Sequence, residues 1–229
     1  MEESGRPSPA GVRPAIAVVP VGLRVEGKTV LVVGAGRIAA RKAETYASQG
    51  ARLIVVAPDH SAEMEAVNVD RRVRRPFVPS DLDGVWFVVT ATGSPAVDGA
   101  VYRAAEARRV WCNAADDPDH CSVVLPAVVR RGDLTATISS GGRSPAVASW
   151  LRRRIDPLLD DDTLAVFEIA ARVRAELQSN GQPTEVPGWS EVLDRDALSL
   201  VAGGRREELE RRLSAAVGLG AVTHTKVDQ

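Results

Sequence analysis

The sequence predicts an α/β fold, a Rossmann-type doubly wound parallel sheet with a helical C-terminal part, on three observations. Short apolar runs alternate with helix-length segments from residue 29 to residue 114. A Gly-Ala-Gly-Arg-Ile-Ala turn at 34–39 joins the first run to the first of these segments. After residue 146 the pattern becomes helical. The 229 residues suffice for one domain with a sizeable core and a smaller appendage.

The first βαβ unit is predicted directly from its apolar runs and stop signals. Thr29–Val33 is typical of a buried parallel strand. Ile38–Gln49 follows as a helix, with Gly50 as its stop signal. Ala51–Ala57 is a second buried strand, closed by Pro58. The short connections favour a parallel sheet.

The same alternation continues towards the middle of the chain. A strand at Val85–Thr92, a helix at Ser94–Arg109 and a strand at Val110–Ala114 are predicted. Two further strands are expected at Ser122–Val129 and Leu134–Ser140, with Arg-Arg-Gly-Asp as the turn between them.

The C-terminal part is predicted as three helices, at Ala146–Leu159, Asp162–Gln178 and Arg206–Val217. Asp162 or Thr163 is the expected cap of the second helix. The Pro- and Gly-containing segment 179–188 separates the second helix from the third. We therefore divide the chain into a disordered tail (1–18), a Rossmann domain (19–143), a helical part (144–217) and a flexible tail (218–229).

Composition excludes several classes of protein. Lys and Arg total 29 against 30 Asp and Glu, giving a net charge of −1, which argues against nucleic acid as a partner. No apolar run approaches the roughly 20 residues that cross a bilayer, and the polar N-terminus lacks a signal peptide's apolar core. The two cysteines form no metal-binding pair, so a cytoplasmic location is expected. The three histidines show no metal-ligand spacing either and are interpreted as surface or turn residues, so no metal site is predicted.

The turn at 34–39 has the GxGxxA pattern of a dinucleotide-binding site. Gly34 permits the tight turn, Gly36 lets a pyrophosphate approach the backbone, and Ala39 allows close packing of helix on sheet. The helix that begins near Arg37 and Ile38 offers unpaired N–H groups and a positive dipole end. The alternative is that the glycines merely permit a tight turn.

The end of the second strand is the expected position of the ribose contact. Asp59, after Pro58, is the carboxylate found there, about 20 residues beyond the glycine turn. No basic cluster follows this strand, which favours NAD over NADP, although Arg37 keeps NADP open. Asp59 could equally be the N-cap of a helix in the segment that follows it.

Two later loops face the same edge of the predicted sheet. Asp116 directly follows a strand and could act as a general acid or base, or form a turn with Asp117 and Pro118. The loop Ser140, Gly141, Gly142 and Arg143 precedes a helix and could bind a carboxylate or phosphate, or simply lead into a Ser144 cap. The Arg152–Arg154 run could extend a cationic wall or form a solvated face.

Together these motifs resemble the precorrin-2 dehydrogenase/sirohydrochlorin ferrochelatase module of siroheme synthases, in its free-standing form without a methyltransferase domain. The resemblance runs from about Pro20 into the C-terminal helices. It depends on "PVGLRVEGKTVLVVGAGRIAARKA", "LDGVWFVVTATGSPAVDGAVYRAAEARRVWCNAADDP" and "LPAVVRRGDLTATISSGGRSPAVASWLRRRI". The chain departs from the family pattern at Gly93, Ser94 and Asp98, where the family has two acids and an amide.

The resemblance implies a function and a set of site residues. Family members oxidise precorrin-2 to sirohydrochlorin with NAD, and many then insert ferrous iron to give siroheme. The family's catalytic aspartate falls on Asp116 of "NAAD", and its loop serine falls on Ser140 beside the tetrapyrrole cleft. The dinucleotide contacts fall on Arg37, Ile38, Pro58 and Asp59. Members are homodimers in which the helical part helps form the interface and the site.

A second hypothesis is a regulatory module that senses NAD without turnover and uses its helices only to dimerise. Such a sensor needs the glycine turn but not a second anion-binding loop facing it. Asp116 and the Ser140–Arg143 loop therefore favour the enzyme. Precorrin-2 would have to be supplied by another protein.

Overall fold

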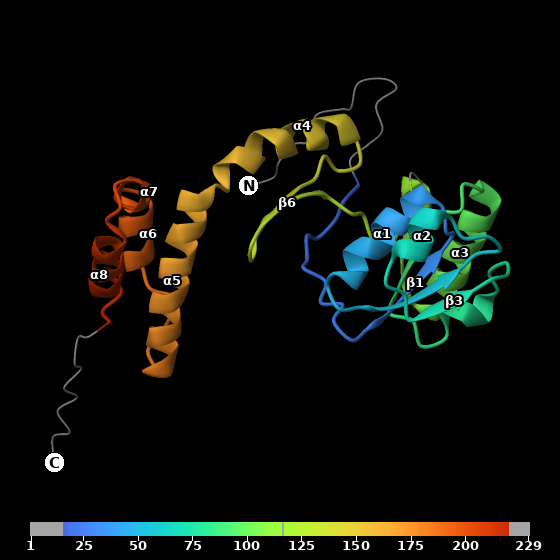
Figure 1. Cartoon of the computed structure of the whole chain (residues 1–229), viewed down its shortest axis with the longest axis horizontal. Helices are drawn as coiled ribbons and strands as arrows, with labels where there is room; N and C mark the ends of the chain where they lie inside the picture. Colours follow the sequence, from blue (N-terminus) through green and yellow to red (C-terminus); the bar gives the residue numbers. More distant parts are fainter. Residues whose placement is uncertain (1–15, 116, 220–229) are drawn as a thin grey trace, which may run out of the picture. The chain divides into compact units, whose positions relative to one another are not determined.

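The computed structural model describes residues 16–115 and 117–219, which form two compact units (Figure 1). One unit runs to Leu125 and includes Gly141–Arg143, and the other comprises Pro126–Ser140 and the chain from Ser144 onward. Within residues 16–115 and 117–219, every helix is too short or too polar to span a bilayer.

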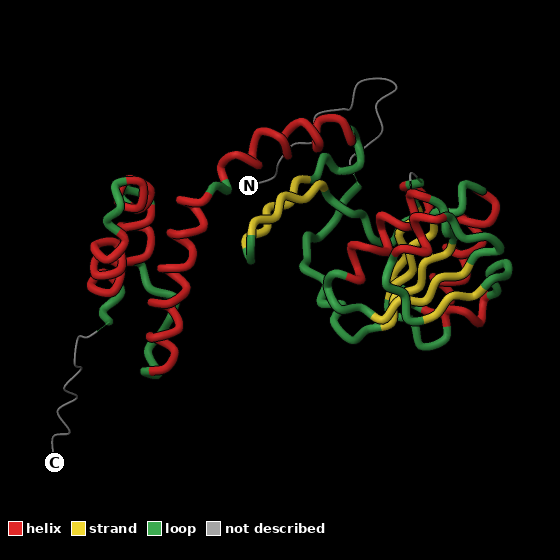
Figure 2. Tube along the Cα trace, in the orientation of Figure 1, coloured by secondary structure: helices red, strands yellow, loops and turns green. Residues whose placement is uncertain are grey.

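The first unit is built on a parallel sheet, as predicted, and this sheet has five strands (Figure 2). Its strands are β1 (Thr29–Val33), β2 (Arg52–Val56), β3 (Arg71–Val73), β4 (Phe87–Thr90) and β5 (Trp111–Ala114), in the order β3-β2-β1-β4-β5. Strand β1 pairs with both β2 and β4, so the strand order reverses beside it. In open α/β sheets, ligands bind at the carboxyl ends of the strands at this reversal point.

Helices cover both faces of this sheet because successive side chains of a strand point to opposite faces. Val30 and Val32 join the core on the side of α1 (Arg37–Ala47) and the short α2 (Ala62–Ala66). Leu31 and Val33 join the core on the side of α3 (Pro95–Arg108) and the 3₁₀ turn Pro79–Leu82. The continuous apolar run of β1 therefore reflects burial on both sides.

Three features of this unit were not predicted or were predicted wrongly. Strand β3 has only three residues, two of them arginines, so it carries no apolar signal. Helix α2 has five residues and was considered only as a segment that Asp59 might cap. The strand predicted at Ser122–Val129 begins only at Ala127. Residues 122 and 123 instead donate their backbone N–H groups to the carbonyl of Cys112, as a loop against β5.

Strands β6 (Ala127–Arg131) and β7 (Leu134–Ile138) form a separate antiparallel hairpin, outside the parallel sheet. The predicted turn between them is confirmed. One face of the hairpin packs against α4 (Pro145–Ile155) around Val129, Ile138 and Ala148. The hairpin thus groups with the C-terminal unit, whereas the sequence placed it in the Rossmann domain.

The C-terminal unit continues as helices, namely α5 (Asp161–Ser179), α6 (Gly188–Leu193), α7 (Ala197–Ala202) and α8 (Arg206–Ala216), after a 3₁₀ turn at Asp156–Leu158. A stripe at four-residue spacing on α5, from Ala165 to Leu177, packs against α7 and α8. Asp160 caps α5 by accepting a hydrogen bond from the Thr163 N–H at 2.9 Å, so the caps predicted at Asp162 or Thr163 are wrong. The six-residue helices α6 and α7 were missed because neither gives a two-turn periodic pattern.

Candidate nucleotide site and its neighbouring loops

Gly34 follows β1 and can only be glycine in this structure. Its φ of +103° lies in the region that L-residues rarely adopt, and an added Cβ would lie 2.5 Å from the carbonyl oxygen of Ala91. Its N–H donates to the carbonyl of Val56 at 2.9 Å. The glycine therefore brings the first turn into contact with the ends of both β2 and β4.

Gly36 has the opposite environment, because it is exposed and a Cβ built on it would meet no protein atom within 4 Å. It is the N-cap of α1, and as a glycine it has no side chain to accept a hydrogen bond from the first turn of that helix. The first N–H groups of a helix have no intrahelical partner. Open space beside unpaired N–H groups at a positive dipole end fits the pyrophosphate of a dinucleotide.

The residues predicted to flank this turn are accessible. Arg37 and Ile38 are exposed, while Ala39 is buried against the sheet. No acidic residue lies in the first turn of α1, so no carboxylate there would repel a bound anion. These positions can hold a dinucleotide.

The segment after β2 lies beside the glycine turn. The Ser61 N–H donates to the carbonyl of Ala35 at 3.0 Å. Pro58 and Asp59 are exposed. Ser61, not Asp59, caps α2 by accepting a hydrogen bond from the Met64 N–H, so the reading of Asp59 as a helix cap is wrong. Asp59 stays a candidate for the ribose contact.

His60 lies in the turn after β2, which fits its interpretation as a turn residue, but its side chain is fully buried and not at the surface. Within the described residues neither ring nitrogen has a hydrogen-bond partner, and a carboxylate oxygen of Glu65 lies 3.8 Å from Nδ1. Burial of this imidazole gave no sequence signal, because histidine is intermediate in its tendency to be buried.

The loop after β4 is hydrogen-bonded to a carboxylate of α3 that we did not predict as a site residue. Asp98, in the first turn of α3, is buried and accepts hydrogen bonds from the hydroxyl groups of Thr90 and Thr92 and from the Thr92 N–H at 3.2 Å. This network holds the loop whose Ala91 carbonyl lies against Gly34. An acid in the first turn of a helix that follows a Thr-rich strand end is the signal that could have indicated it.

The predicted catalytic residue Asp116 lies outside the described residues. The residue before it is hydrogen-bonded to the end of β4, because the Ala115 N–H donates to the carbonyl of Thr90 at 2.8 Å. The Asp117 carboxylate lies 2.7 Å from Nδ1 of His120, and this hydrogen bond holds the pKa of Asp117 below its ordinary range. The His120 ring in turn packs edge-on against Tyr102 of α3.

The two cysteines near this loop are predicted to be unreactive. Burial raises the pKa of Cys112 to about 12, and burial also raises the pKa of Cys121. A raised pKa keeps the thiol protonated, so very little of Cys112 is the nucleophilic thiolate at pH 8. Iodoacetamide at pH 8 should label the folded protein much more slowly than the protein in urea, as measured by mass spectrometry. Equal labelling of Cys112 in both states would contradict its burial.

The loop predicted to bind substrate carboxylates leads into α4. Ser144 caps this helix by accepting from the Val147 N–H, which confirms the capping alternative, and its own N–H donates to Oγ of Ser140 at 3.0 Å. Gly141 and Gly142 both have positive φ, of 61° and 76°. The adjacent Arg143 is exposed.

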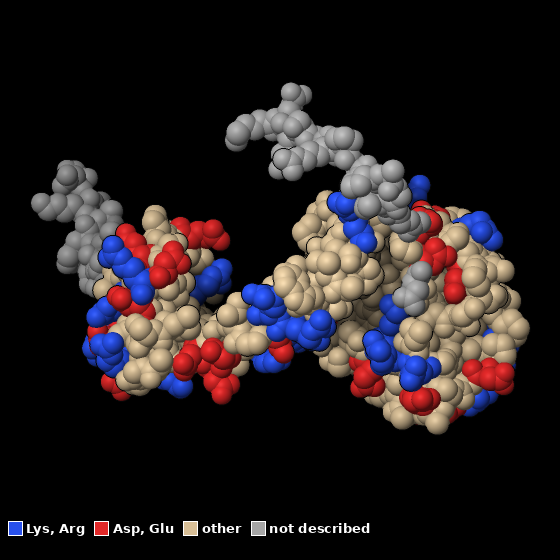
Figure 3. Space-filling view, turned by 90° about the horizontal axis from the view of Figure 1, so that it is seen from above, with Lys and Arg blue, Asp and Glu red and all other residues tan. Residues whose placement is uncertain are grey.

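Basic side chains gather along the stretch of the molecule that α4 occupies (Figure 3). Arg152, Arg153 and Arg154 lie in its last turn. The guanidinium of Arg154 lies 5.2 Å from the centre of the Trp150 ring, and 48% of Trp150 is exposed. This part of α4 offers a cationic, partly aromatic surface.

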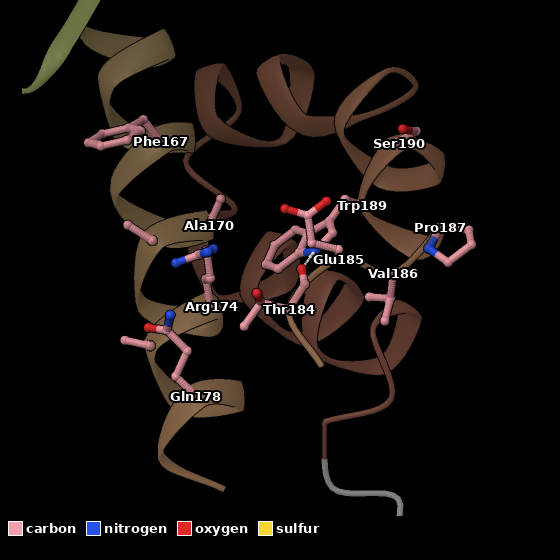
Figure 4. A pocket seen from close by; sticks show the side chains of 12 residues that line it. Phe167, Ala170, Arg174, Gln178, Thr184, Glu185, Val186, Pro187, Trp189 and Ser190 are labelled. Atoms are coloured by element: carbon pink, nitrogen blue, oxygen red, sulfur yellow. Dashed lines mark hydrogen bonds between the residues drawn. The ribbon is translucent and has the colours of Figure 1, made fainter. Parts of the chain in front are cut away.

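A groove of about 800 Å³ lies on the helical unit, between α5 and the segment that leads into α6 (Figure 4). Phe167, Arg174 and Gln178 line its α5 side, and Glu185 and Trp189 lie on the other side. None of the site residues predicted from the sequence lines this groove.

Comparisons with known proteins find similar sequences over most of the chain. Residues 21–127 match a family model described as "Putative NAD(P)-binding". "Siroheme synthase 3" of Aeromonas hydrophila is 35% identical over 187 residues, which cover 79% of this chain and 40% of that protein. "Siroheme synthase 1" of Yersinia enterocolitica is 32% identical over 206 residues, covering 87% of this chain and 43% of that protein. The chain thus spans about two fifths of the length of these curated relatives.

A solved structure titled "SirC, precorrin-2 dehydrogenase" has the same fold. It matches with a TM-score of 0.67 and 23% sequence identity, covering 86% of this chain and 100% of that chain. The match confirms the predicted α/β fold with C-terminal helices.

Proposed function

Because this chain is related to the siroheme synthases and its residues 21–127 belong to an NAD(P)-binding family, we propose that it is an NAD-dependent precorrin-2 dehydrogenase. It would oxidise precorrin-2 to sirohydrochlorin. The observation that carries the proposal is the turn at 34–39, where Gly34 is required by the fold and Gly36 leaves open space at an uncapped helix.

NAD is the favoured form of the cofactor. Asp59 is the exposed charged residue directly after β2, and no Lys or Arg lies between β2 and the end of α2. A carboxylate at this position accepts hydrogen bonds from a ribose with free hydroxyls and repels a 2′-phosphate. Gly34, Gly36, Arg37, Ile38, Pro58 and Asp59 would hold the dinucleotide.

Precorrin-2 carries many carboxylate side chains, so its site needs cations and hydrogen-bond donors. Arg143 and the loop Ser140–Gly142 offer these at the start of α4, and Arg152–Arg154 lie on the same helix. Charge complementarity of this kind supports the assignment of Ser140, Gly141, Gly142 and Arg143 as substrate contacts.

Oxidation of precorrin-2 removes a hydride and a proton from the macrocycle. NAD, when bound, supplies the acceptor for the hydride. The protein aligns the substrate and takes the proton, and we assign that proton transfer to the carboxylate of Asp116. No group of His, Cys, Asp or Glu among residues 16–115 and 117–219 could hold a metal ion. The proposal covers the oxidation step alone.

A homodimer is the proposed assembly. One face of the hairpin β6–β7 packs against α4, and Val128, which alternates with the buried Val129, is 42% exposed. The groove along α5 adds further apolar surface on the same unit. Light scattering should give a mass of about 49 kDa, twice the 24.3 kDa of the chain. A mass equal to one chain at micromolar concentration would refute the dimer.

Turnover tests the proposed function against the NAD-sensing alternative. The protein is incubated with NAD and precorrin-2, and NADH and sirohydrochlorin are followed by absorbance. The dehydrogenase should form both products in equal amounts, and more slowly with NADP. Tight NAD binding without turnover would favour the sensor.

The free thiols Cys112 and Cys121 fit a reducing cytoplasm, which is the proposed location.

A further inference from the structure

Lys42 of α1 makes a long-range contact with the end of β5. Its Nζ donates a hydrogen bond to Oδ1 of Asn113 at 3.0 Å, across 71 positions of sequence. Asn113 is 5% exposed, so this contact lies inside the first unit. Helix α1 is the one whose N-terminus forms the candidate dinucleotide site. The contact therefore ties the proposed cofactor helix to the strand that precedes the 115–121 loop.

Asn113 in turn contacts residues at the end of the loop. Its Nδ2 donates to the carbonyl of Val123 at 2.9 Å and lies 3.6 Å from Sγ of Cys121. Sγ of Cys121 accepts a hydrogen bond from the Ala114 N–H at 3.2 Å. The same sulfur lies 3.2 Å from the carbonyl oxygen of Asp117, to which its S–H can donate. A continuous set of hydrogen bonds thus runs from α1 to both ends of the loop.

Lys42 acts on Cys121 through its positive charge, in addition to its hydrogen bond with Asn113. Burial raises the pKa of Cys121, while the hydrogen bond from Ala114 and the positive charge of Lys42 act in the opposite direction. Lys42 therefore provides both a hydrogen bond to Asn113 and a positive charge near Cys121.

We propose that Lys42 is a positioning residue, which through Asn113 and Cys121 holds the described chain on both sides of position 116 to the cofactor helix. The proposal rests on the proposed dehydrogenase function, in which this loop supplies the base. A shift of about 1 Å in a catalytic loop can lower a rate about 100-fold. Loss of Lys42 should therefore affect catalysis much more than cofactor binding.

The kinetic test compares Lys42→Met with a matched control. The variant should lower kcat/KM for precorrin-2 by about 10- to 100-fold, with the Kd for NAD within about twofold. Lys42→Arg, which keeps the charge and a donor, should recover part of this loss. Lys28→Met is the control, because Lys28 precedes β1 and stacks on Trp86, 4.2 Å from its ring centre. It should leave both constants unchanged.

A double variant tests whether Lys42 acts through Asn113. Residues that act through one hydrogen bond give non-additive effects. Lys42→Met combined with Asn113→Ala should be no slower than the slower single variant. Additive losses, or a kcat/KM of Lys42→Met within twofold of the unmodified protein, would overturn the proposal.

Hydrogen exchange tests the same idea without turnover. Lys42→Met should speed amide exchange in peptides that contain Ala114, Ser122 and Val123, whose N–H groups are bonded in or beside the loop. Lys28→Met should not. Unchanged exchange in Lys42→Met would overturn the positioning role. Absence of turnover by the unmodified protein would instead refute the proposed function, and exchange would then decide alone whether Lys42 holds the loop.

Discussion

Replacing Asp116 with alanine should lower kcat for precorrin-2 oxidation by about 10²- to 10⁴-fold, the usual contribution of a positioned general base. The Kd for NAD should stay within about twofold, because the expected dinucleotide contacts lie on the glycine turn and after β2. Both constants are measured on the purified protein, kcat by NADH absorbance and Kd by calorimetry.

Two further variants make this result specific. Asp116→Asn keeps the size of the side chain and removes the base, so it should be as slow as the alanine variant. Asp117→Ala is the neighbouring control and loses the hydrogen bond to His120. It should lower kcat by less than about tenfold. Equal loss of turnover and NAD binding in Asp116→Ala would mean that the residue only shapes a turn.

Replacing Gly36 with leucine should raise the Kd for NAD at least about 100-fold, a loss of about 2.8 kcal/mol. The fold should persist, because a Cβ at this position meets no protein atom within 4 Å and its φ of −80° suits any residue. Binding is measured by calorimetry, and folding by the midpoint of urea unfolding. The leucine would occupy the space that the pyrophosphate needs.

Two other glycines serve as controls for Gly36→Leu. Gly22 also has open space around it, lies outside the predicted site, and as leucine should leave NAD binding unchanged. Gly34→Ala should instead lower the free energy of unfolding by about 1–3 kcal/mol. Position 34 has a positive φ, and the added Cβ would clash with the carbonyl oxygen of Ala91. If Gly36→Leu binds NAD with the affinity of the unmodified protein, the glycine turn does not bind the dinucleotide.

The parts of the fold with strong local signals could be predicted from the sequence. Strands β1, β2, β4 and β5 are apolar runs bounded by turn residues, and α1 and α3 begin and end near the predicted positions. The glycine turn is recognisable because it follows a strand and precedes a helix. Its environment in the structure explains why position 34 must be glycine, whereas position 36 leaves open space that the proposed cofactor site would use.

Other parts depend on contacts between distant residues, which one sequence does not reveal. The association of the β6–β7 hairpin with α4 depends on packing around Val129 and Ala148. The pairing of Lys42 with Asn113 joins two motifs whose residues are ordinary when taken singly. Asp98 differs from the family pattern, but its burial beside two threonines was visible only in the structure. Short elements such as β3 and α6 have too few residues to show a period.

The most direct test of the proposed function is to follow the transferred hydrogen. Precorrin-2 that carries deuterium at the carbon that gives up hydride is incubated with the protein and unlabelled NAD, and the NADH is analysed by mass spectrometry. A dehydrogenase that brings cofactor and macrocycle together should yield one deuterium per NADH, matched by one sirohydrochlorin. Unlabelled NADH, or sirohydrochlorin formed without NADH, would contradict it.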